Sequence, residues 1–177
     1  MRLDLNGASL SYDARTPFAV TALSGVSLAI EPGERVGVAG PVGSGKSSLL
    51  ELLAGVTPPS AGEVLHNDLP PAALRQGGVG LCLQEPERCL FERTVRADVA
   101  FGPRQRGLGE DEVEERIEKA LQQAGLDSAA FGHRNPFHLS AGEQRRVALA
   151  GVLALAPEVL ILDEPAAGLD AFGKKFL

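Results

Sequence analysis

The segment GPVGSGKS, residues 40–47, constrains the fold of this 177-residue chain more than any other stretch. It matches the pattern G-x-x-x-x-G-K-[ST] and joins an apolar segment, Arg35–Ala39, expected to be a strand, to a leucine-rich segment, Ser47–Gly55, expected to be a helix. Glycines let the backbone N–H groups of such a loop turn toward phosphate oxygens, and the following helix adds the positive end of its dipole. The segment therefore predicts a phosphate-binding loop in an α/β fold.

Individual residues of this loop have expected roles. Lys46 places a positive charge against the β- and γ-phosphates of a nucleotide, and the Ser47 hydroxyl is an expected Mg²⁺ ligand. The alternative is a glycine-rich turn that binds nothing, which the position between strand and helix disfavours. The nucleotide-binding residues predicted in this loop are Gly40, Pro41, Gly43, Ser44, Gly45, Lys46, Ser47 and Ser48.

A second feature is the apolar run Val159–Leu162, which ends in Asp163 and Glu164. A buried strand would place Asp163 at its carboxyl end, where parallel sheets bind ligands, and there it would hold Mg²⁺ through water. Glu164 would then orient or deprotonate an attacking water molecule. Taken alone, the run could also be a strand that ends at a polar turn; after a phosphate-binding loop it predicts a catalytic edge.

The third feature, LSAGE at residues 139–143, precedes a helix with an apolar face. Ser140 and Glu143 have the spacing of a capping box, which closes the start of a helix. The same helix start could bind an anion through Ser140 and Gly142. The two interpretations are compatible, because a capped helix still presents free N–H groups.

Together these motifs resemble those of the ATP-binding cassette (ABC) ATPases. LSAGE is similar to the LSGGQ signature of that family, Gln84 to its Q-loop glutamine, and AGLD at 167–170 to its D-loop. The resemblance implies ATP and Mg²⁺ as ligands, Glu164, Lys46 and Gln84 as catalytic residues, and Ser47, Asp163 and Gln84 around the metal. It also implies that Tyr12 stacks on adenine, with Phe18 as the alternative platform, and that Ser140 and Gly142 face the nucleotide of a second ATPase subunit.

The resemblance implies an α/β fold, with a P-loop NTPase core, an N-terminal antiparallel β subdomain and an inserted helical subdomain. The expected divisions are residues 1–87, 88–156 and 157–177. Relatives continue past the D-loop to another core strand, so we expect this chain to be an incomplete domain whose C-terminal core strands are missing. Two apolar strands, Arg35–Ala39 and Val159–Asp163, would then each lack a neighbour. Ala171–Leu177 is expected to begin a helix.

A finer resemblance lies in residues 80–103, GLCLQEPERCLFERTVRADVAFGP, which are similar to the ATPases of energy-coupling factor (ECF) and cobalt/nickel uptake transporters. It implies that the segment after Gln84 lines a groove for helices of a transmembrane subunit. Whether Leu90, Phe91 and Val95 belong to the core or to that docking surface stays open. The expected function is ATP binding and hydrolysis that energises a membrane importer, ECF-type, for a metal ion or a vitamin.

Composition sets the remaining limits. The net charge of −6 disfavours a nucleic-acid partner, and the longest apolar run, Val147–Ala156, is too short to cross a membrane. Two cysteines that fit neither a disulfide framework nor a C-x-x-C site favour the cytoplasm, and the resemblance to importer ATPases implies a peripheral position on the inner face of the cell membrane. The alternatives are a catalytically impaired nucleotide-binding module and a soluble ABC ATPase not tied to transport. Surface or polar-loop positions are expected for His66, His133 and His138, and an exposed helix side for Arg145 and Arg146.

Overall fold

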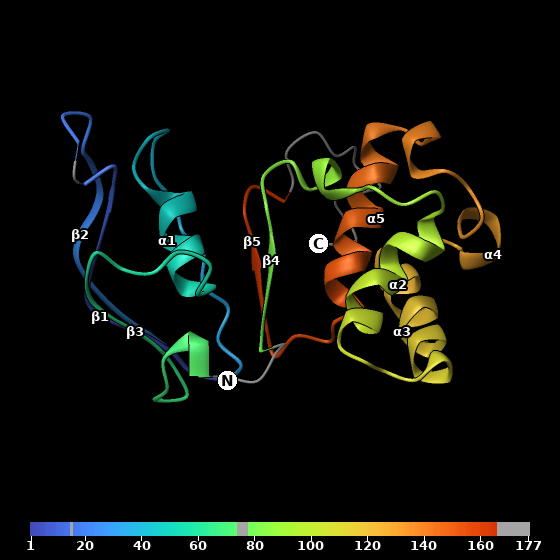
Figure 1. Cartoon of the computed structure of the whole chain (residues 1–177), viewed down its shortest axis with the longest axis horizontal. Coiled ribbons are helices and arrows are strands. Elements are labelled where there is room, and N and C mark those ends of the chain that lie inside the picture. The colour runs from blue at the N-terminus through green and yellow to red at the C-terminus, as the bar shows by residue number, and fades with distance from the viewer. Residues whose placement is uncertain (15, 74–77, 166–177) are drawn as a thin grey trace. The chain divides into compact units, whose positions relative to one another are not determined.

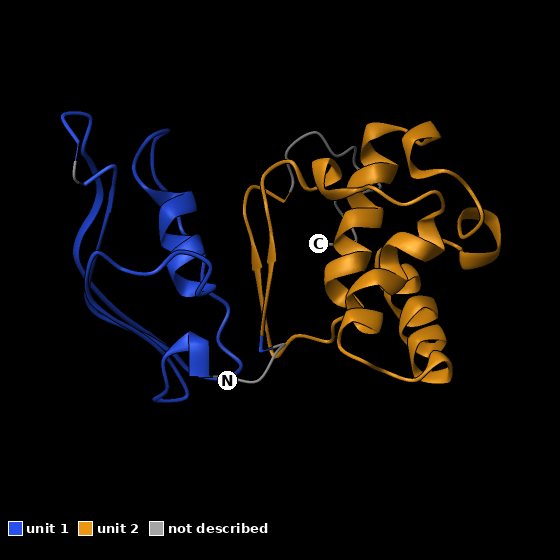
Figure 2. Ribbon diagram, viewed as in Figure 1, with its two compact units in different colours: residues 1–78 blue, residues 79–177 orange. Residues whose placement is uncertain are grey.

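The computed structural model describes residues 1–14, 16–73 and 78–165, which form two compact units, Met1–Gly78 and Val79–Leu177 (Figure 2). The first unit contains strands β1 (Leu3–Tyr12), β2 (Val20–Ile30) and β3 (Ala61–His66) and helix α1 (Lys46–Leu53). The second contains strands β4 (Val79–Cys82) and β5 (Val159–Leu162). Its helices are α2 (Val95–Gln105), α3 (Glu110–Gln123), α4 (Ser128–Phe131) and α5 (Ala141–Leu153). Short 3₁₀ turns, η1 (Pro71–Ala73), η2 (Pro86–Cys89) and η3 (Pro136–His138), complete the described elements.

The strands of the first unit form an antiparallel sheet in the order β2-β1-β3, beside which α1 lies (Figure 1). The central strand β1 turns Leu3, Leu5, Ala8 and Leu10 into the core, each at most 2% exposed. The step from Leu5 to Ala8 breaks the two-residue alternation because the register shifts between them, at Gly7, whose φ is +57°. A glycine adopts this conformation without strain, so the strand keeps one buried face on both sides of the shift.

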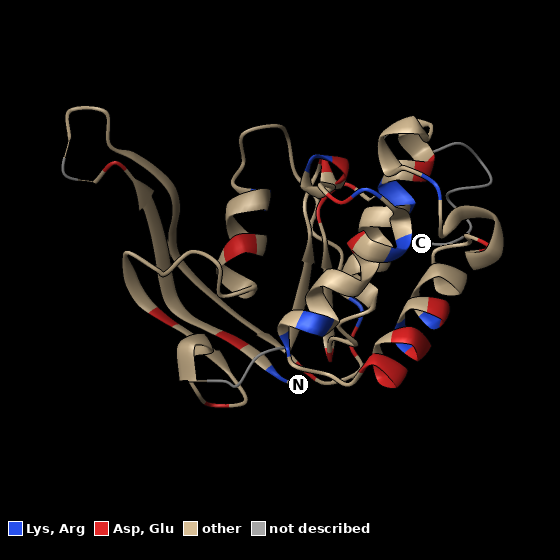
Figure 3. Cartoon of the chain, turned by 45° about the vertical axis from the view of Figure 1, so that its right-hand side comes forward, with Lys and Arg blue, Asp and Glu red and all other residues tan. Residues whose placement is uncertain are grey.

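In the second unit, β4 and β5 run parallel and α5 packs against both β4 and the neighbouring helices α2 and α3 (Figure 1). Apolar side chains at helical spacing, such as Val95 and Val99 on α2 and Val113 and Ile117 on α3, meet Val147 of α5 in a fully buried cluster. Acidic residues are frequent along α3 (Figure 3), and three of them, Glu114, Glu110 and Glu112, pair with Arg96, Arg104 and Arg116 respectively. The Glu-, Arg- and Lys-rich pattern of residues 110–119 predicts a solvated helix face, and the structure confirms it, since the acidic residues there are exposed.

Most expected elements are present, with shifted ends. The alternation in Val26–Ile30 predicts a strand, and β2 contains it but begins at Val20. The helical spacing of Ala141–Ala156 predicts a helix, and α5 ends earlier, at Leu153, since Ala156 has a positive φ of 47°. The helical spacing of Thr94–Phe101 predicts a helix, and α2 extends past it through Pro103, which lies fully buried. Packing against the core thus outweighs the missing N–H of the proline. The expected D-loop at 167–170 and the helix expected from Ala171 lie outside the described residues.

The expected strand Arg35–Ala39 is wrong. Residues 34–40 belong to no strand, and none of the described residues forms a ladder with them. Val36 and Val38 are 49% and 39% exposed. An extended segment becomes a strand only when a neighbour takes up its backbone N–H and C=O groups, and here the described strands supply none. β5 likewise pairs only with β4 in the described part of the chain.

Two expectations about polar side chains are also wrong. His66 is 2% exposed, because it lies on β3 and its Nε2 bonds the main-chain oxygen of Leu53 at the end of α1, 2.8 Å away. Arg145 does not lie on an exposed helix side: its side chain is 15% exposed and reaches η2. Arg146 is half-buried as well. In contrast, His133 and His138 are exposed as predicted.

Candidate active site

The predicted phosphate-binding loop lies in the first unit, immediately before α1. Gly43 and Gly45 both adopt left-handed conformations, with φ of 78° and 87°. A Cβ on Gly45 would lie 2.7 Å from the main-chain oxygen of Ala22, so the loop passes too close to β2 for any larger residue. Gly45 is also the N-cap of α1, and no side chain caps this helix. The helix start therefore keeps the free N–H groups that an anion would need.

The Lys46 side chain folds back over its own loop. Its Nζ donates to the main-chain oxygens of Gly40 and Pro41, both at 3.0 Å. The ammonium group is thereby held above the residues that were predicted to surround the phosphates. A phosphate could replace these two carbonyl oxygens as hydrogen-bond acceptor, with the stronger bonds of an ionised partner.

Tyr12 is the last residue of β1 and reaches the same helix. Its hydroxyl lies 3.0 Å from the Ser48 Oγ and donates to Glu51 at 3.3 Å. The ring is 40% exposed, which leaves part of it free for contact with a ligand. Phe18, the alternative platform, is 78% exposed. The first unit thus brings together Tyr12 and the predicted nucleotide-binding residues of the loop.

In the second unit, the carboxyl ends of β4 and β5 form a polar edge. Their register pairs Cys82 with Leu162, and the Asp163 N–H continues the ladder by donating to the Cys82 oxygen at 2.9 Å. Residues 84 and 164 therefore follow at corresponding positions, and Gln84 Nε2 donates to Glu164 Oε2 at 2.8 Å. Asp163 is 8% exposed. Three predicted site residues, Gln84, Asp163 and Glu164, are thus neighbours.

Glu164 has an unusual backbone conformation for its residue type, with φ of 47°. Left-handed conformations cost a residue with a Cβ about 1–2 kcal/mol. Such strain persists where the surroundings hold it in place and is concentrated at functional sites. Here it turns the carboxylate toward Gln84 at the point where β5 ends.

Ser140 and Gly142 lie at the start of α5, where the predicted capping box is present. The Ser140 Oγ donates to a carboxylate oxygen of Glu143 at 2.6 Å, and the Ser140 N–H donates to the same oxygen at 2.8 Å. These hydrogen bonds, from the hydroxyl first, lower the pKa of Glu143. Ala141 has an ordinary helical conformation, so the alanine at this position causes no strain.

Sequence reasoning missed Arg145 and Glu87, which connect the start of α5 with Gln84. Arg145, on the first turns of α5, donates to the main-chain oxygen of Gln84 at 3.0 Å and pairs with Glu87 at 3.3 Å. The residues after Gln84 form a Glu-x-x-x-Cys segment, and its pattern does not indicate that Arg145, some sixty residues later in the chain, is its partner. Tertiary packing of η2 on α5 creates this contact.

An apolar cavity of about 230 Å³ adjoins this edge, between the segment after Gln84 and helices α2 and α5. Leu90 and Val95, 8% and 0% exposed, belong to the core, whereas Phe91 is 55% exposed at the cavity. Phe91 packs edge-on against Phe101, with ring centroids 4.8 Å apart. The cavity is also lined by Cys82, whose pKa is raised to about 11 by burial, so its thiol stays protonated.

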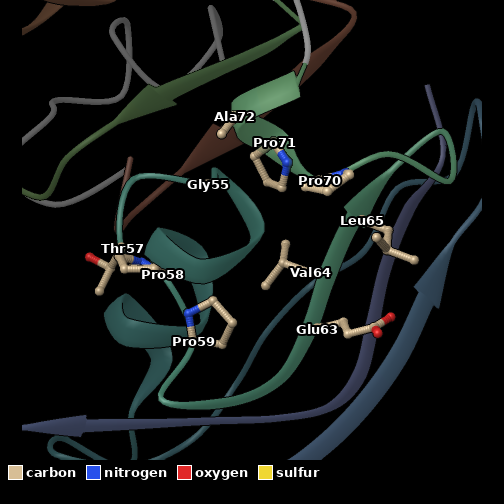
Figure 4. Close-up of a pocket in the computed structure, with 10 residues that line it drawn as sticks. All are labelled: Gly55, Thr57, Pro58, Pro59, Glu63, Val64, Leu65, Pro70, Pro71 and Ala72. Carbon is tan, nitrogen blue, oxygen red and sulfur yellow. The ribbon is translucent and has the colours of Figure 1, made fainter.

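A further cavity of about 420 Å³ lies in the first unit (Figure 4). It contains none of the predicted site residues, and Glu63 is the one charged residue among those lining it. The others are Gly55, Thr57, Pro58, Pro59, Val64, Leu65, Pro70, Pro71 and Ala72. Prolines and aliphatic side chains offer no groups for phosphate chemistry, so this cavity is separate from the candidate site.

Two kinds of feature are absent from the described residues, 1–14, 16–73 and 78–165. None of their helices is long and apolar enough to cross a membrane. They also contain no cluster of three or more His, Cys, Asp or Glu side chains that could hold a metal ion. A Mg²⁺ held mainly by nucleotide phosphates needs fewer protein ligands, since magnesium sites of this kind use one or two protein groups plus water.

Known proteins resemble this chain in sequence. It is 49% identical to the energy-coupling factor transporter ATP-binding protein EcfA2 of Symbiobacterium thermophilum, over 99% of this chain and 62% of that protein. It is 46% identical to EcfA of Methanothermobacter thermautotrophicus, over 95% of this chain and 54% of that protein. The chain thus spans between about half and two thirds of the length of these curated relatives.

Solved structures resemble it as well. CbiO1 from Clostridium perfringens, part of the ABC transporter complex CbiONQ, superposes with a TM-score of 0.80 at 35% identity, over 98% of this chain and 69% of that one. A dimeric ATP-binding cassette in a post-hydrolysis state, bound to ADP and Pi, superposes with a TM-score of 0.86 at 26% identity, over 98% and 78%. The ABC transporter family model matches residues 23–167. This chain belongs to the ABC transporter family, in the form of its ATP-binding cassette.

Proposed function

We propose that the chain binds and hydrolyses ATP to energise a membrane importer of the ECF type, for a metal ion or a vitamin. The observation that carries the proposal is the shared edge of β4 and β5, where Gln84 contacts Glu164 beside the buried Asp163. A chain that combines this edge with a phosphate-binding loop has the groups that ATP hydrolysis needs. The similarity to EcfA2 and CbiO1 supports the transport role.

ATP binding is assigned to the first unit. The uncapped start of α1 and the Lys46 ammonium would bind the phosphates, and the exposed part of the Tyr12 ring would stack on adenine. Lys46 exchanges its bonds to Gly40 and Pro41 for bonds to phosphate oxygens. The lysine charge then offsets the negative charge that accumulates as the γ-phosphoryl group leaves.

The residues present also suit Mg²⁺, because all the predicted ligands offer oxygen atoms: the Ser47 hydroxyl, the Asp163 carboxylate and the amide oxygen of Gln84. Gln84 donates its nitrogen to Glu164, which leaves its oxygen free to accept or coordinate. When bound, Mg²⁺ would neutralise charge on the β- and γ-phosphates.

Hydrolysis is assigned to the Glu164 carboxylate. It would accept a proton from the water molecule whose oxygen attacks the γ-phosphorus, while the bond from that phosphorus to the β–γ bridging oxygen breaks. A positioned base of this kind typically contributes about 10²–10⁴-fold in rate. Gln84, already hydrogen-bonded to the carboxylate, fixes the direction in which it points.

Two partners are proposed, one at the start of α5 and one at the cavity that Phe91 and Phe101 line. Ser140 and Gly142 would face the nucleotide on a second ATPase subunit, as the dimeric form of the similar cassette suggests. The cavity beside Phe91 and Phe101 would receive a helix of a transmembrane subunit, which holds the chain at the inner face of the membrane. Exposed aromatic side chains at an apolar cavity are typical of such contacts.

The decisive test compares ATP binding and ATP hydrolysis by the protein with those of its Glu164→Gln variant. We expect the variant to bind Mg²⁺-ATP as tightly as the unaltered protein while its turnover falls about 10²–10⁴-fold. Glu115→Gln, on the exposed face of α3, is the matched control and should hydrolyse ATP normally. Binding by the unaltered protein without any turnover would favour the impaired nucleotide-binding module instead.

A further inference from the structure

We infer that Arg145 is a positioning residue that holds Gln84 at its main chain and so connects it to the start of α5; this rests on the proposed ATPase function. The starting observation is that Gln84 is bound at two points. Its side-chain nitrogen donates to Glu164 at 2.8 Å, and its main-chain oxygen accepts from Arg145 Nη2 at 3.0 Å. The second contact comes from a helix, α5, that begins with the signature residues.

The guanidinium group of Arg145 has a second partner that fixes its direction. Its Nε pairs with a carboxylate oxygen of Glu87 at 3.3 Å, and Glu87 lies on η2, three residues after Gln84. A planar guanidinium can serve a carboxylate and a carbonyl at once, which the single ammonium group of a lysine does less well. The arginine therefore holds the turn and the glutamine together.

Partial burial distinguishes this ion pair from the others in the same unit. The side chains of Arg145 and Glu87 are 15% and 24% exposed, whereas those of Arg104 and Glu110 are 50% and 72% exposed. Exposed pairs contribute little because water and salt screen them, and shielded charge-assisted bonds are stronger. The Arg145 contact is thus suited to hold Gln84 in position, which an exposed ion pair is not.

The consequence is a continuous series of contacts between two predicted site regions. Ser140 caps α5, Arg145 follows on the next turn, and its guanidinium reaches the residue whose amide contacts Glu164. A shift of the α5 start would therefore move Gln84 and change its placement against Glu164. Small misplacements of groups that orient reacting atoms cost large factors in rate.

The kinetic test uses Arg145→Gln, with Arg104→Gln as the matched control. We expect Arg145→Gln to lower kcat about tenfold and to raise the Mg²⁺ concentration needed for half-maximal rate, with KM for ATP nearly unchanged. Arg145→Lys should recover part of the rate, because it keeps the charge and one of the two contacts. Arg104→Gln should match the unaltered protein.

A double variant separates positioning from general stabilisation. If Arg145 acts through Gln84, Gln84→Ala with Arg145→Gln should be no slower than Gln84→Ala alone. Effects that multiply, or a loss of rate that merely follows a lower melting temperature, would overturn the inference.

Hydrogen exchange tests the contact without any nucleotide. Amides of residues 84–89 should exchange faster in Arg145→Gln than in the unaltered protein, and those of the first unit should not change. If the amides of residues 84–89 exchange equally fast in Arg145→Gln and in the unaltered protein, the inference is overturned, whatever the rate of ATP hydrolysis. Conversely, if the unaltered protein does not hydrolyse ATP, the proposed function fails, while faster exchange still supports the link between Arg145 and Gln84.

Discussion

Gln84 and Glu164, eighty residues apart in the chain, are joined by a hydrogen bond of 2.8 Å from the amide nitrogen to the carboxylate. The parallel register of β4 and β5 explains the contact, because Cys82 pairs with Leu162 and both side chains follow two residues later. Neither residue belongs to a strand, so the pair extends the two strands beyond their ends. The positive φ of Glu164 completes the arrangement.

The positive φ of Glu164 predicts that a substitution there can raise stability while it abolishes activity. Glu164→Gly should raise the free energy of unfolding by up to about 1 kcal/mol, since glycine adopts a positive φ without strain, although the bond to Gln84 is lost. ATP hydrolysis should disappear. Chemical denaturation measures the first effect and a phosphate-release assay the second.

Glu115→Gly is the control for that experiment. The same change within the exposed face of α3 should lower the free energy of unfolding by about 1 kcal/mol, because glycine weakens a helix interior. The two variants should therefore differ in sign. Equal destabilisation by both would show that the backbone at Glu164 is not strained.

The predicted phosphate-binding loop makes a similar comparison possible at two glycines. Gly43→Ala and Gly45→Ala both place a Cβ at a positive φ, yet only at Gly45 would the new atom meet a main-chain oxygen, at 2.7 Å. We expect Gly43→Ala to cost about 1–2 kcal/mol and Gly45→Ala to cost more and to weaken ATP binding. Denaturation together with ATP titration tests this, and a larger loss of stability at Gly43 would contradict it.

His66 predicts a pH dependence of stability. Burial lowers its pKa below the ordinary 6.5, although the bond to the Leu53 oxygen opposes the shift. The unfolded chain therefore binds a proton more readily than the folded one as the pH falls through about 6.5. The stability of the first unit should be complete above that pH and should decrease below it.

His66→Gln should flatten this dependence, because glutamine can donate to Leu53 without titrating. His133→Gln, at an exposed position, should leave the dependence as it is. Denaturation curves between pH 5 and pH 8 would check both. If the free energy of unfolding of His66→Gln still decreases between pH 8 and pH 5 as in the unaltered protein, groups other than His66 cause the dependence.

The aromatic pair at the apolar cavity predicts a loss of partner binding. Phe91→Ser should weaken binding to the transmembrane subunit of an ECF transporter, measured with both proteins purified in detergent, and should leave ATP affinity unchanged. Loss of the edge-on contact with Phe101 should lower stability by about 0.5–1.5 kcal/mol. Leu69→Ser, at a residue 48% exposed in the first unit, is the control that should bind normally.

Tyr12 allows its ring and its hydroxyl to be tested separately. Tyr12→Phe loses the contacts with Ser48 and Glu51 but keeps the ring, so ATP affinity should change little. Tyr12→Ala should cost about 1–3 kcal/mol of binding free energy, the value of one stacking contact. An equal loss in both variants would mean that the hydroxyl, and not stacking, is what matters.

Local patterns in the sequence predicted much of this protein. The glycine turn before α1, the Ser140–Glu143 capping box and the apolar strand before Asp163 each depend on neighbours within a few residues, and the structure has all three. Residues 35–39 are equally apolar, yet the strand predicted from them is not present there. A strand needs a partner, and a partner is not a local property.

Tertiary structure alone decided the contacts between distant segments. The sequence named Gln84 and Glu164 separately, but only the register of β4 against β5 joined them. It placed Arg145 and His66 at the surface, whereas packing buries His66, partly buries Arg145 and gives each a main-chain oxygen to bind. Periodicity and motifs report which faces are apolar and which loops turn. They do not report which segment lies opposite, because that depends on how the whole chain satisfies its buried polar groups.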